Sequence, residues 1–183
     1  MLRFLIALAL LVSLPACDTV TDDPDDDPSV QDDDDDGPTA ATVTLALDWG
    51  RIYVIGDCES PIFTNTGDFR FAVSGSSDLD GATSSFNVMN REFAVDAGDD
   101  VGVVGDNESF DLLEGQMGSV VVDFSGSESD PTGPDPDLSP SSGSQTHTFD
   151  GTRWSNLGDR TITLGNSDNC RAEFRYEASS STS

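Results

Sequence analysis

The sequence has no lysine and only one histidine, and these two absences exclude several functions. Its eight basic residues are all arginines and stand against 35 acidic residues, so the formal net charge is -27. A surface this negative repels nucleic acids and the headgroups of anionic lipids, because both are polyanions. We therefore expect the protein to bind no nucleic acid and to have no electrostatic affinity for a membrane.

Catalytic patterns are also missing. A Ser-His-Asp triad would need His147 as its base, and the sequence contains neither G-x-S-x-G nor H-E-x-x-H. We expect His147 to be an exposed residue at a strand edge. The 24 acidic residues from Thr39 onward are too many to single out the carboxylate pair of a glycosidase. The sequence thus predicts no enzyme, and a carbohydrate-active hydrolase is the alternative from another functional class.

Long hydrophobic runs are absent after the first sixteen residues, and that leader carries the clearest motif. The apolar run Phe4–Leu14 is too short to span about 30 Å of hydrocarbon as a mature helix. It ends in Leu14, Pro15, Ala16 and Cys17, which resembles the lipobox of bacterial lipoprotein signal peptides. The resemblance implies removal of residues 1–16, acylation of Cys17 by chains such as palmitate, and a membrane as partner through that lipid.

Residues 17–38 are predicted to be a disordered tether between the lipidated cysteine and a folded domain. Eleven acids, with Pro, Ser and Gly between them, leave too little apolar surface to fold. An acidic run directly after such a cysteine resembles the surface-export signal of Bacteroidota lipoproteins. That resemblance implies a cell-envelope location, with the outer membrane and the cell surface favoured over the inner membrane.

The excess of aspartate over lysine resembles the composition of proteins from salt-loving microbes. Like charges at this density oppose compaction, and a Debye length of about 3 Å at 1 M salt would screen them. We therefore expect a halophilic protein. The alternative is an ordinary acidic domain joined to an acidic linker.

A helical period is absent too, and short alternating runs between turn residues predict an all-β domain over residues 39–178. In the clearest run, Cys170–Ala178, every second residue is apolar and the intervening residues are charged. About eight short strands predict an antiparallel β-sandwich or barrel. Residues 125–145 are predicted to be a mobile loop, and residues 179–183 a disordered tail.

The order of the strands, with aspartates in the turns, resembles the calcium- and phospholipid-binding β-sandwiches of the protein kinase C regulatory type. The resemblance covers residues 42–178. It implies a sandwich rather than a barrel.

Two cysteines remain after lipidation of Cys17, namely Cys58 and Cys170. An even remainder in an exported chain predicts a disulfide, which would close a long loop and stabilise the fold. We expect this bond to be structural.

Two kinds of binding site are candidates. Calcium takes six to eight oxygen ligands, and aspartates in neighbouring turns could supply them, in which case calcium would stabilise the fold; these are Asp78, Asp80, Asp99, Asp100 and Asp106. Trp49 and Trp154 lie beside predicted turns and could stack on a sugar, as in a lectin. The alternatives are ordinary turn chemistry for the aspartates and core packing for the indoles. The sequence as a whole predicts a lipid-anchored binding or structural module of the envelope.

Overall fold

A computed structural model gives the structure of residues 39–56, 58, 66–96, 98–128, 138–165 and 170–183. These residues belong to one compact unit, Pro38–Ser183. The predicted signal peptide, Cys17 and the acidic tether lie outside the described residues.

Nine strands make up the described part of the unit, and no helix occurs in that part. The strands are β1 (Thr42–Ile55), β2 (Thr66–Leu79), β3 (Ala82–Asp96), β4 (Asp100–Gly102), β5 (Glu108–Leu113), β6 (Gly118–Glu128), β7 (Ser141–Phe149), β8 (Gly158–Leu164) and β9 (Arg171–Thr182).

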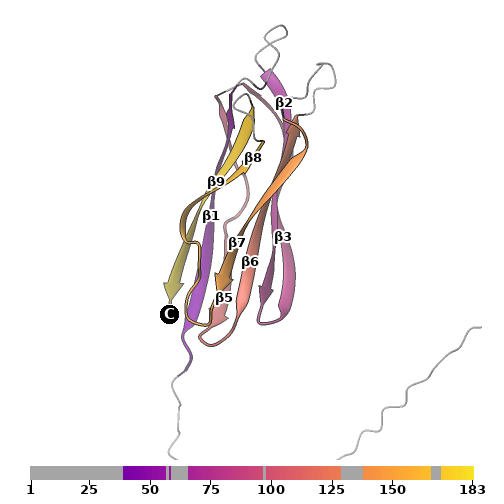
Figure 1. The fold of residues 1–183 in the computed structure, drawn as a ribbon. Helices are drawn as coiled ribbons and strands as arrows, with labels where there is room; N and C mark the ends of the chain where they lie inside the picture. Colours follow the sequence, from indigo (N-terminus) through magenta and orange to yellow (C-terminus); the bar gives the residue numbers. More distant parts are fainter. Residues whose placement is uncertain (1–38, 57, 59–65, 97, 129–137, 166–169) are drawn as a thin grey trace, which may run out of the picture. The chain divides into compact units, whose positions relative to one another are not determined.

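The strands form two antiparallel sheets (Figure 1). The five-stranded sheet has the order β4-β1-β9-β8, and β5 pairs with another part of β1. The four-stranded sheet has the order β3-β2-β6-β7. The two sheets pack face to face, so the predicted all-β antiparallel sandwich is confirmed.

Alternation along β9 shows why these residues form strands. Ala172, Phe174, Tyr176 and Ala178 are buried, while the residues between them point to the other face of the sheet. Successive side chains of a strand point to opposite faces, so this pattern places one row in the core and one row outside.

A β-bulge interrupts the alternation of β1. Val43, Leu45 and Leu47 face inward before it, and Ile52 and Val54 face inward after it. The register with β9 shifts between Trp49 and Arg51. A Cβ on Gly50 would lie 2.4 Å from the carbonyl oxygen of Arg175, so only glycine fits at this point.

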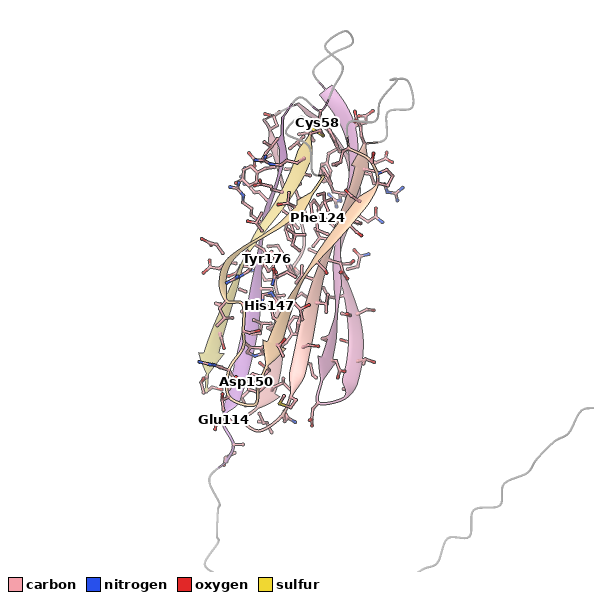
Figure 2. All side chains as sticks on the ribbon, in the orientation of Figure 1. Cys58, Glu114, Phe124, His147, Asp150 and Tyr176 are labelled. Carbon is pink, nitrogen blue, oxygen red and sulfur yellow. A yellow bond between two sulfur atoms is a disulfide. The ribbon has the colours of Figure 1, made fainter. Side chains whose placement is uncertain are left out.

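Phenylalanine rings join the two sheets across the core, and Figure 2 labels one of them, Phe124. Phe124 of β6 lies 5.5 Å from Phe174 of β9 and 5.6 Å from Phe71 of β2, measured between ring centroids. Each fully buried ring contributes about 1.5–3 kcal/mol to stability by removing apolar surface from water.

The predicted disulfide lies at one end of the sandwich. Cys58, just after β1, is bonded to Cys170, just before β9, across 112 residues of sequence. Both half-cystines are 1% exposed. The bond therefore closes a long loop at the end of the core.

Two predictions about disorder differ from the structure. Ser125–Glu128 continue β6, and Ser141–Gln145 begin β7, where Gly126 pairs with Ser141. Only residues 129–137 of the predicted mobile loop lie outside the described residues. Ser179–Thr182, predicted to be a disordered tail, pair with β1 as the last part of β9. Strand pairing in both places supplies the backbone hydrogen bonds that polar composition alone does not reveal.

Candidate binding groove on the five-stranded sheet

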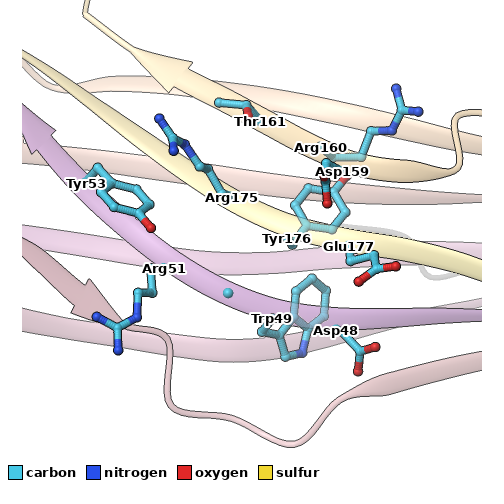
Figure 3. Close-up of a pocket in the computed structure, with 11 residues that line it drawn as sticks. Asp48, Trp49, Arg51, Tyr53, Asp159, Arg160, Thr161, Arg175, Tyr176 and Glu177 are labelled. Carbon is cyan, nitrogen blue, oxygen red and sulfur yellow. The ribbon is translucent and has the colours of Figure 1, made fainter.

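A groove of about 600 Å³ lies on the outer face of the five-stranded sheet, beside the bulge of β1. Figure 3 shows that it runs across β1, β9 and β8. Gly50 contributes no side chain there, so the bulge leaves space that a regular strand would fill. Two rows of charged side chains border this space.

The first row consists of Asp48, Glu177 and Asp159, hereafter the carboxylate row. Asp48 of β1 pairs directly with Glu177 of β9, which in turn pairs with Asp159 of β8. All three side chains are exposed. Like charges opposite one another on neighbouring strands destabilise a sheet. Of the three, only Asp48 accepts a hydrogen bond from another side chain in the described structure, from Nδ2 of Asn107.

The second row consists of Arg51 and Arg175, which face each other across β1 and β9 and are hereafter the arginine row. Arg51 forms an ion pair with Asp100, and the hydrogen bond between them raises the pKa of the guanidinium. Arg175 lies 2.6 Å from a carboxylate oxygen of Glu173, and this bond lowers the pKa of Glu173. Both arginines are therefore ion-paired, Arg175 through a carboxylate that it shares with Arg171, and each keeps free N–H donors.

Tyr53 lies beside the arginine row. Its ring is half-buried, and the guanidinium carbon of Arg175 lies 4.3 Å from the ring centroid. Tyr53 is not among the binding residues predicted from the sequence. The signal was present, because Ile52 and Val54 face inward and the residue between them must face outward.

Arginines gather around this groove although the protein is strongly acidic. Of the seven in the described residues, Arg51, Arg160, Arg171 and Arg175 lie on the five-stranded sheet, and all but Arg171 line the groove. One flank of the groove therefore carries the donors of Arg51 and Arg175, and the other carries the carboxylate row together with Arg160.

His147 is buried, which contradicts the prediction that it is an exposed strand-edge residue. It is 0% exposed and faces the core from β7, as Phe149 does two residues later. Nδ1 donates to the carbonyl oxygen of Ser155 at 3.4 Å, because that oxygen can only accept. Nε2 then accepts a hydrogen bond from the Tyr176 hydroxyl at 2.9 Å, so this bond joins the two sheets.

Burial shifts the pKa of both members of this pair. It lowers the pKa of His147 and raises the pKa of Tyr176, because each would lose the solvation of its charged form. The nearby positive charge of Arg160 also lowers the pKa of His147. The pair therefore stays neutral and serves to hold the sheets together beneath the groove.

Neither tryptophan offers a free face for a sugar, contrary to the lectin hypothesis as the sequence framed it. Trp154 is 3% exposed and packs against Phe149, with 5.3 Å between ring centroids. Trp49 lies in the bulge rather than beside a turn, and its indole stacks on Phe86. Its Nε1 donates to the carbonyl oxygen of Asp106 at 2.9 Å. Only part of Trp49 borders the groove.

The aspartates predicted to bind calcium do not converge. Asp78 and Asp80 belong to the β2–β3 hairpin, where they accept hydrogen bonds from the Gly81 amide and the Gln116 side chain. The amide of Asp80 bonds to the carbonyl oxygen of Met117, in the turn after Leu113, which pairs with Thr42 at the start of β1. The hairpin therefore lies at the end of the sandwich where β1 begins. Asp100 instead faces Tyr53, about 35 Å along β1 from its start at Thr42.

Asp99 is beside Asp100, and Asp106 lies between β4 and β5. No group of three or more acidic, histidine or cysteine side chains suited to a metal occurs among the described residues. These five aspartates therefore do not fit the oxygen shell that calcium requires.

No helix in the described part of the chain is long and apolar enough to cross a membrane.

Comparison with known proteins identifies no family for this chain. No family model matches the chain, and no curated protein matches it. One solved structure, a C2 domain protein from Ramazzottius varieornatus, is similar over 76% of this chain and 89% of its own. Its sequence identity is 10% and its TM-score 0.27, values too low to support an argument about function.

Proposed function

We propose that this protein is a lipid-anchored module of the bacterial cell envelope that binds a ligand in the groove of its five-stranded sheet. The leader and its lipobox-like ending support the anchor. The groove supports the binding function, because it brings together exposed carboxylates, arginines and an aromatic ring on one accessible face.

Binding is favoured over hydrolysis by the setting of the carboxylates. A glycosidase needs an acid whose proton is retained in a shielded environment. The carboxylate row lies on an open sheet face, and all three of its side chains are exposed. Such a setting suits hydrogen bonding to a ligand better than general acid catalysis.

The anchor is tested by replacing Cys17 with serine. We expect wild-type protein to fractionate with membranes and the Cys17→Ser variant to be released, because serine lacks the thiol that forms the thioether. Mass spectrometry of the wild-type protein should show acyl chains on Cys17. An unacylated N-terminus on membrane-associated protein would contradict the anchor.

The groove is tested by filling it. Soluble Cys17→Ser protein should co-sediment with envelope material from which lipid has been extracted. Adding Thr161→Trp, which places a large side chain in the groove from an exposed position on β8, should reduce co-sedimentation at least about tenfold. Thr83→Trp, at an exposed position on β3 of the other sheet, is the matched control and should leave it unchanged. Equal binding by both variants would contradict a ligand site in this groove.

A further inference from the structure

We propose that the ligand of this groove is a neutral glycan, that is, a chain of sugars without net charge. The inference rests on the proposed binding function and adds the class of ligand. Four features of the groove lead to it, namely the hydrogen-bonding character of its flanks, the state of its charges, its closed backbone and its aromatic ring.

The flanks match a hydroxyl-rich ligand. Along β9, Glu177 of the carboxylate row and Arg175 of the arginine row are two residues apart, about 7 Å along the strand. A carboxylate only accepts hydrogen bonds and a guanidinium only donates them. Sugar hydroxyls do both, so one sugar ring lying between the rows can donate to one flank and accept from the other.

The charges disfavour an anionic ligand. Arg51 is paired with Asp100, Glu173 is shared by Arg175 and Arg171, and Arg160 forms no ion pair in the described structure. Two of these four arginine charges are thus compensated within the pairs. The carboxylate row adds further negative charge beside them. A phosphate or an acidic sugar would be repelled, whereas an uncharged hydroxyl can use the donors that the ion pairs leave free.

The backbone of the groove floor disfavours a peptide that adds as a strand. At the groove β1 is hydrogen-bonded to β9 on one side and to β4 on the other, and β9 is flanked by β1 and β8. Of the three strands that line the groove, only β8 is an edge strand of the sheet. An extended peptide binds a sheet through unpaired backbone groups at an edge. Only side chains of β1 and β9 are therefore presented to a ligand.

The ring of Tyr53 supplies an apolar surface at one end of the groove. It is half-buried and is held in place by Arg175, so little side-chain entropy is lost when a ligand packs against it. The C–H face of a sugar is apolar and fits such a ring. Figure 3 shows Tyr53 beside Arg51 and Arg175, on the side of the groove away from the carboxylate row.

The ligand class is tested with the same lipid-extracted envelope material after two separate treatments. Periodate cleaves the vicinal diols of sugars, and a broad-specificity protease removes protein. We expect periodate to abolish co-sedimentation of the Cys17→Ser protein and protease to leave it intact. Co-sedimentation should also survive 1 M sodium chloride, because neutral hydroxyls form no ion pairs that salt could screen.

The outcomes separate the two proposals. Binding that survives periodate but is lost after protease treatment would overturn the glycan inference and leave the binding function standing. Binding that is lost in 1 M chloride would overturn the neutral character of the ligand. Absence of binding to untreated material would overturn the binding function itself.

Matched variants connect the ligand to these residues. Tyr53→Ala should weaken binding about tenfold, while Tyr53→Phe, which keeps the ring, should bind as the parent protein does. Arg175→Gln should also weaken binding, and Arg70→Gln, the control on β2 of the other sheet, should not. Each variant is first checked for an unchanged thermal transition. Full binding by folded Tyr53→Ala and Arg175→Gln proteins would exclude these residues from the site.

Discussion

The buried environment of His147 determines both the protonation state of its ring and its role in the fold. One ring nitrogen of His147 donates to a backbone carbonyl and the other accepts from the Tyr176 hydroxyl, and the second bond requires the neutral ring. A protonated ring would lose its acceptor for Tyr176 and bury a charge. His147 is therefore a structural residue whose protonation opposes folding.

The lowered pKa of His147 predicts acid sensitivity below about pH 6.5. The folded-state pKa of His147 is lowered, so the unfolded chain takes up a proton first as the pH falls below about 6.5. The free energy of unfolding should then fall by up to about 1.4 kcal/mol per pH unit, until the pH reaches the folded-state pKa. Urea denaturation at pH 7.5, 6.0 and 5.0 measures this change in the free energy of unfolding.

The control is His147→Gln, which keeps polar atoms at this position but does not titrate. The variant should be less stable at pH 7.5 and should lose the part of the pH dependence that belongs to the ring. Asp150 and Glu173 also have lowered pKa values, but carboxylates of this kind affect stability below about pH 4.5, outside the window. Parallel pH profiles for parent and variant would show that His147 does not titrate on unfolding.

The alternation of strands could be predicted from the sequence, and the partners of those strands could not. The inward row of β9 follows directly from its period of two. The same period, applied to His147 and Phe149, indicates that both face inward. Residues 125–145 contain too much Ser and Gly to be recognised as strands. Ser125–Glu128 and Ser141–Gln145 pair nonetheless. A Cβ on Gly126 would lie 2.5 Å from the Phe71 ring, so glycine is needed for packing there.

The groove itself depends on an irregularity that sequence patterns barely reveal. Thr42–Leu47 and Ile52–Ile55 look like two strands separated by a turn at Trp49 and Gly50. The structure shows one strand with a bulge, because β9 pairs with both halves. A lone glycine inside an alternating run is the available signal, and it does not reveal which residues on β8 and β9 lie opposite.

The disulfide connects the start of β9 to the end of β1, and its loss should lower the stability of the protein markedly. Closing a loop of this length restricts the unfolded chain, which contributes up to about 4–5 kcal/mol in the chain-entropy model. The double variant Cys58→Ala, Cys170→Ala should therefore melt roughly 10 °C lower than the parent protein in a thermal scan. Membrane localisation should not change, since Cys17 is untouched.

Reduction offers a control for this prediction. Parent protein treated with a reductant should melt near the temperature of the double variant, and the variant should not respond to the reductant. Reaction of both Cys58 and Cys170 with an alkylating agent in the native exported protein would contradict the disulfide.

At the scale of the whole molecule, a net charge of -27 makes stability a function of ionic strength. Self-repulsion among carboxylates opposes compaction and is screened as the Debye length falls from about 10 Å at 0.1 M salt to about 3 Å at 1 M. The carboxylate row concentrates this repulsion on one sheet face, because its three members are direct cross-strand neighbours. We therefore expect the melting temperature to rise by several degrees between 0.1 and 1 M sodium chloride.

The charge row provides the discriminating variant for this last prediction. Asp159→Asn removes one member of the row while nearly preserving its size, so Glu177 loses a like-charged neighbour. The variant should be more stable than the parent protein at 0.1 M chloride by about 0.5 kcal/mol. Added salt should raise its stability by less than it raises that of the parent protein. Asp123→Asn, at an exposed position on β6 of the other sheet, is the matched control for the removal of one charge. If both variants respond to salt equally, the repulsion is spread over the whole surface, and if neither they nor the parent protein respond, self-repulsion does not limit stability.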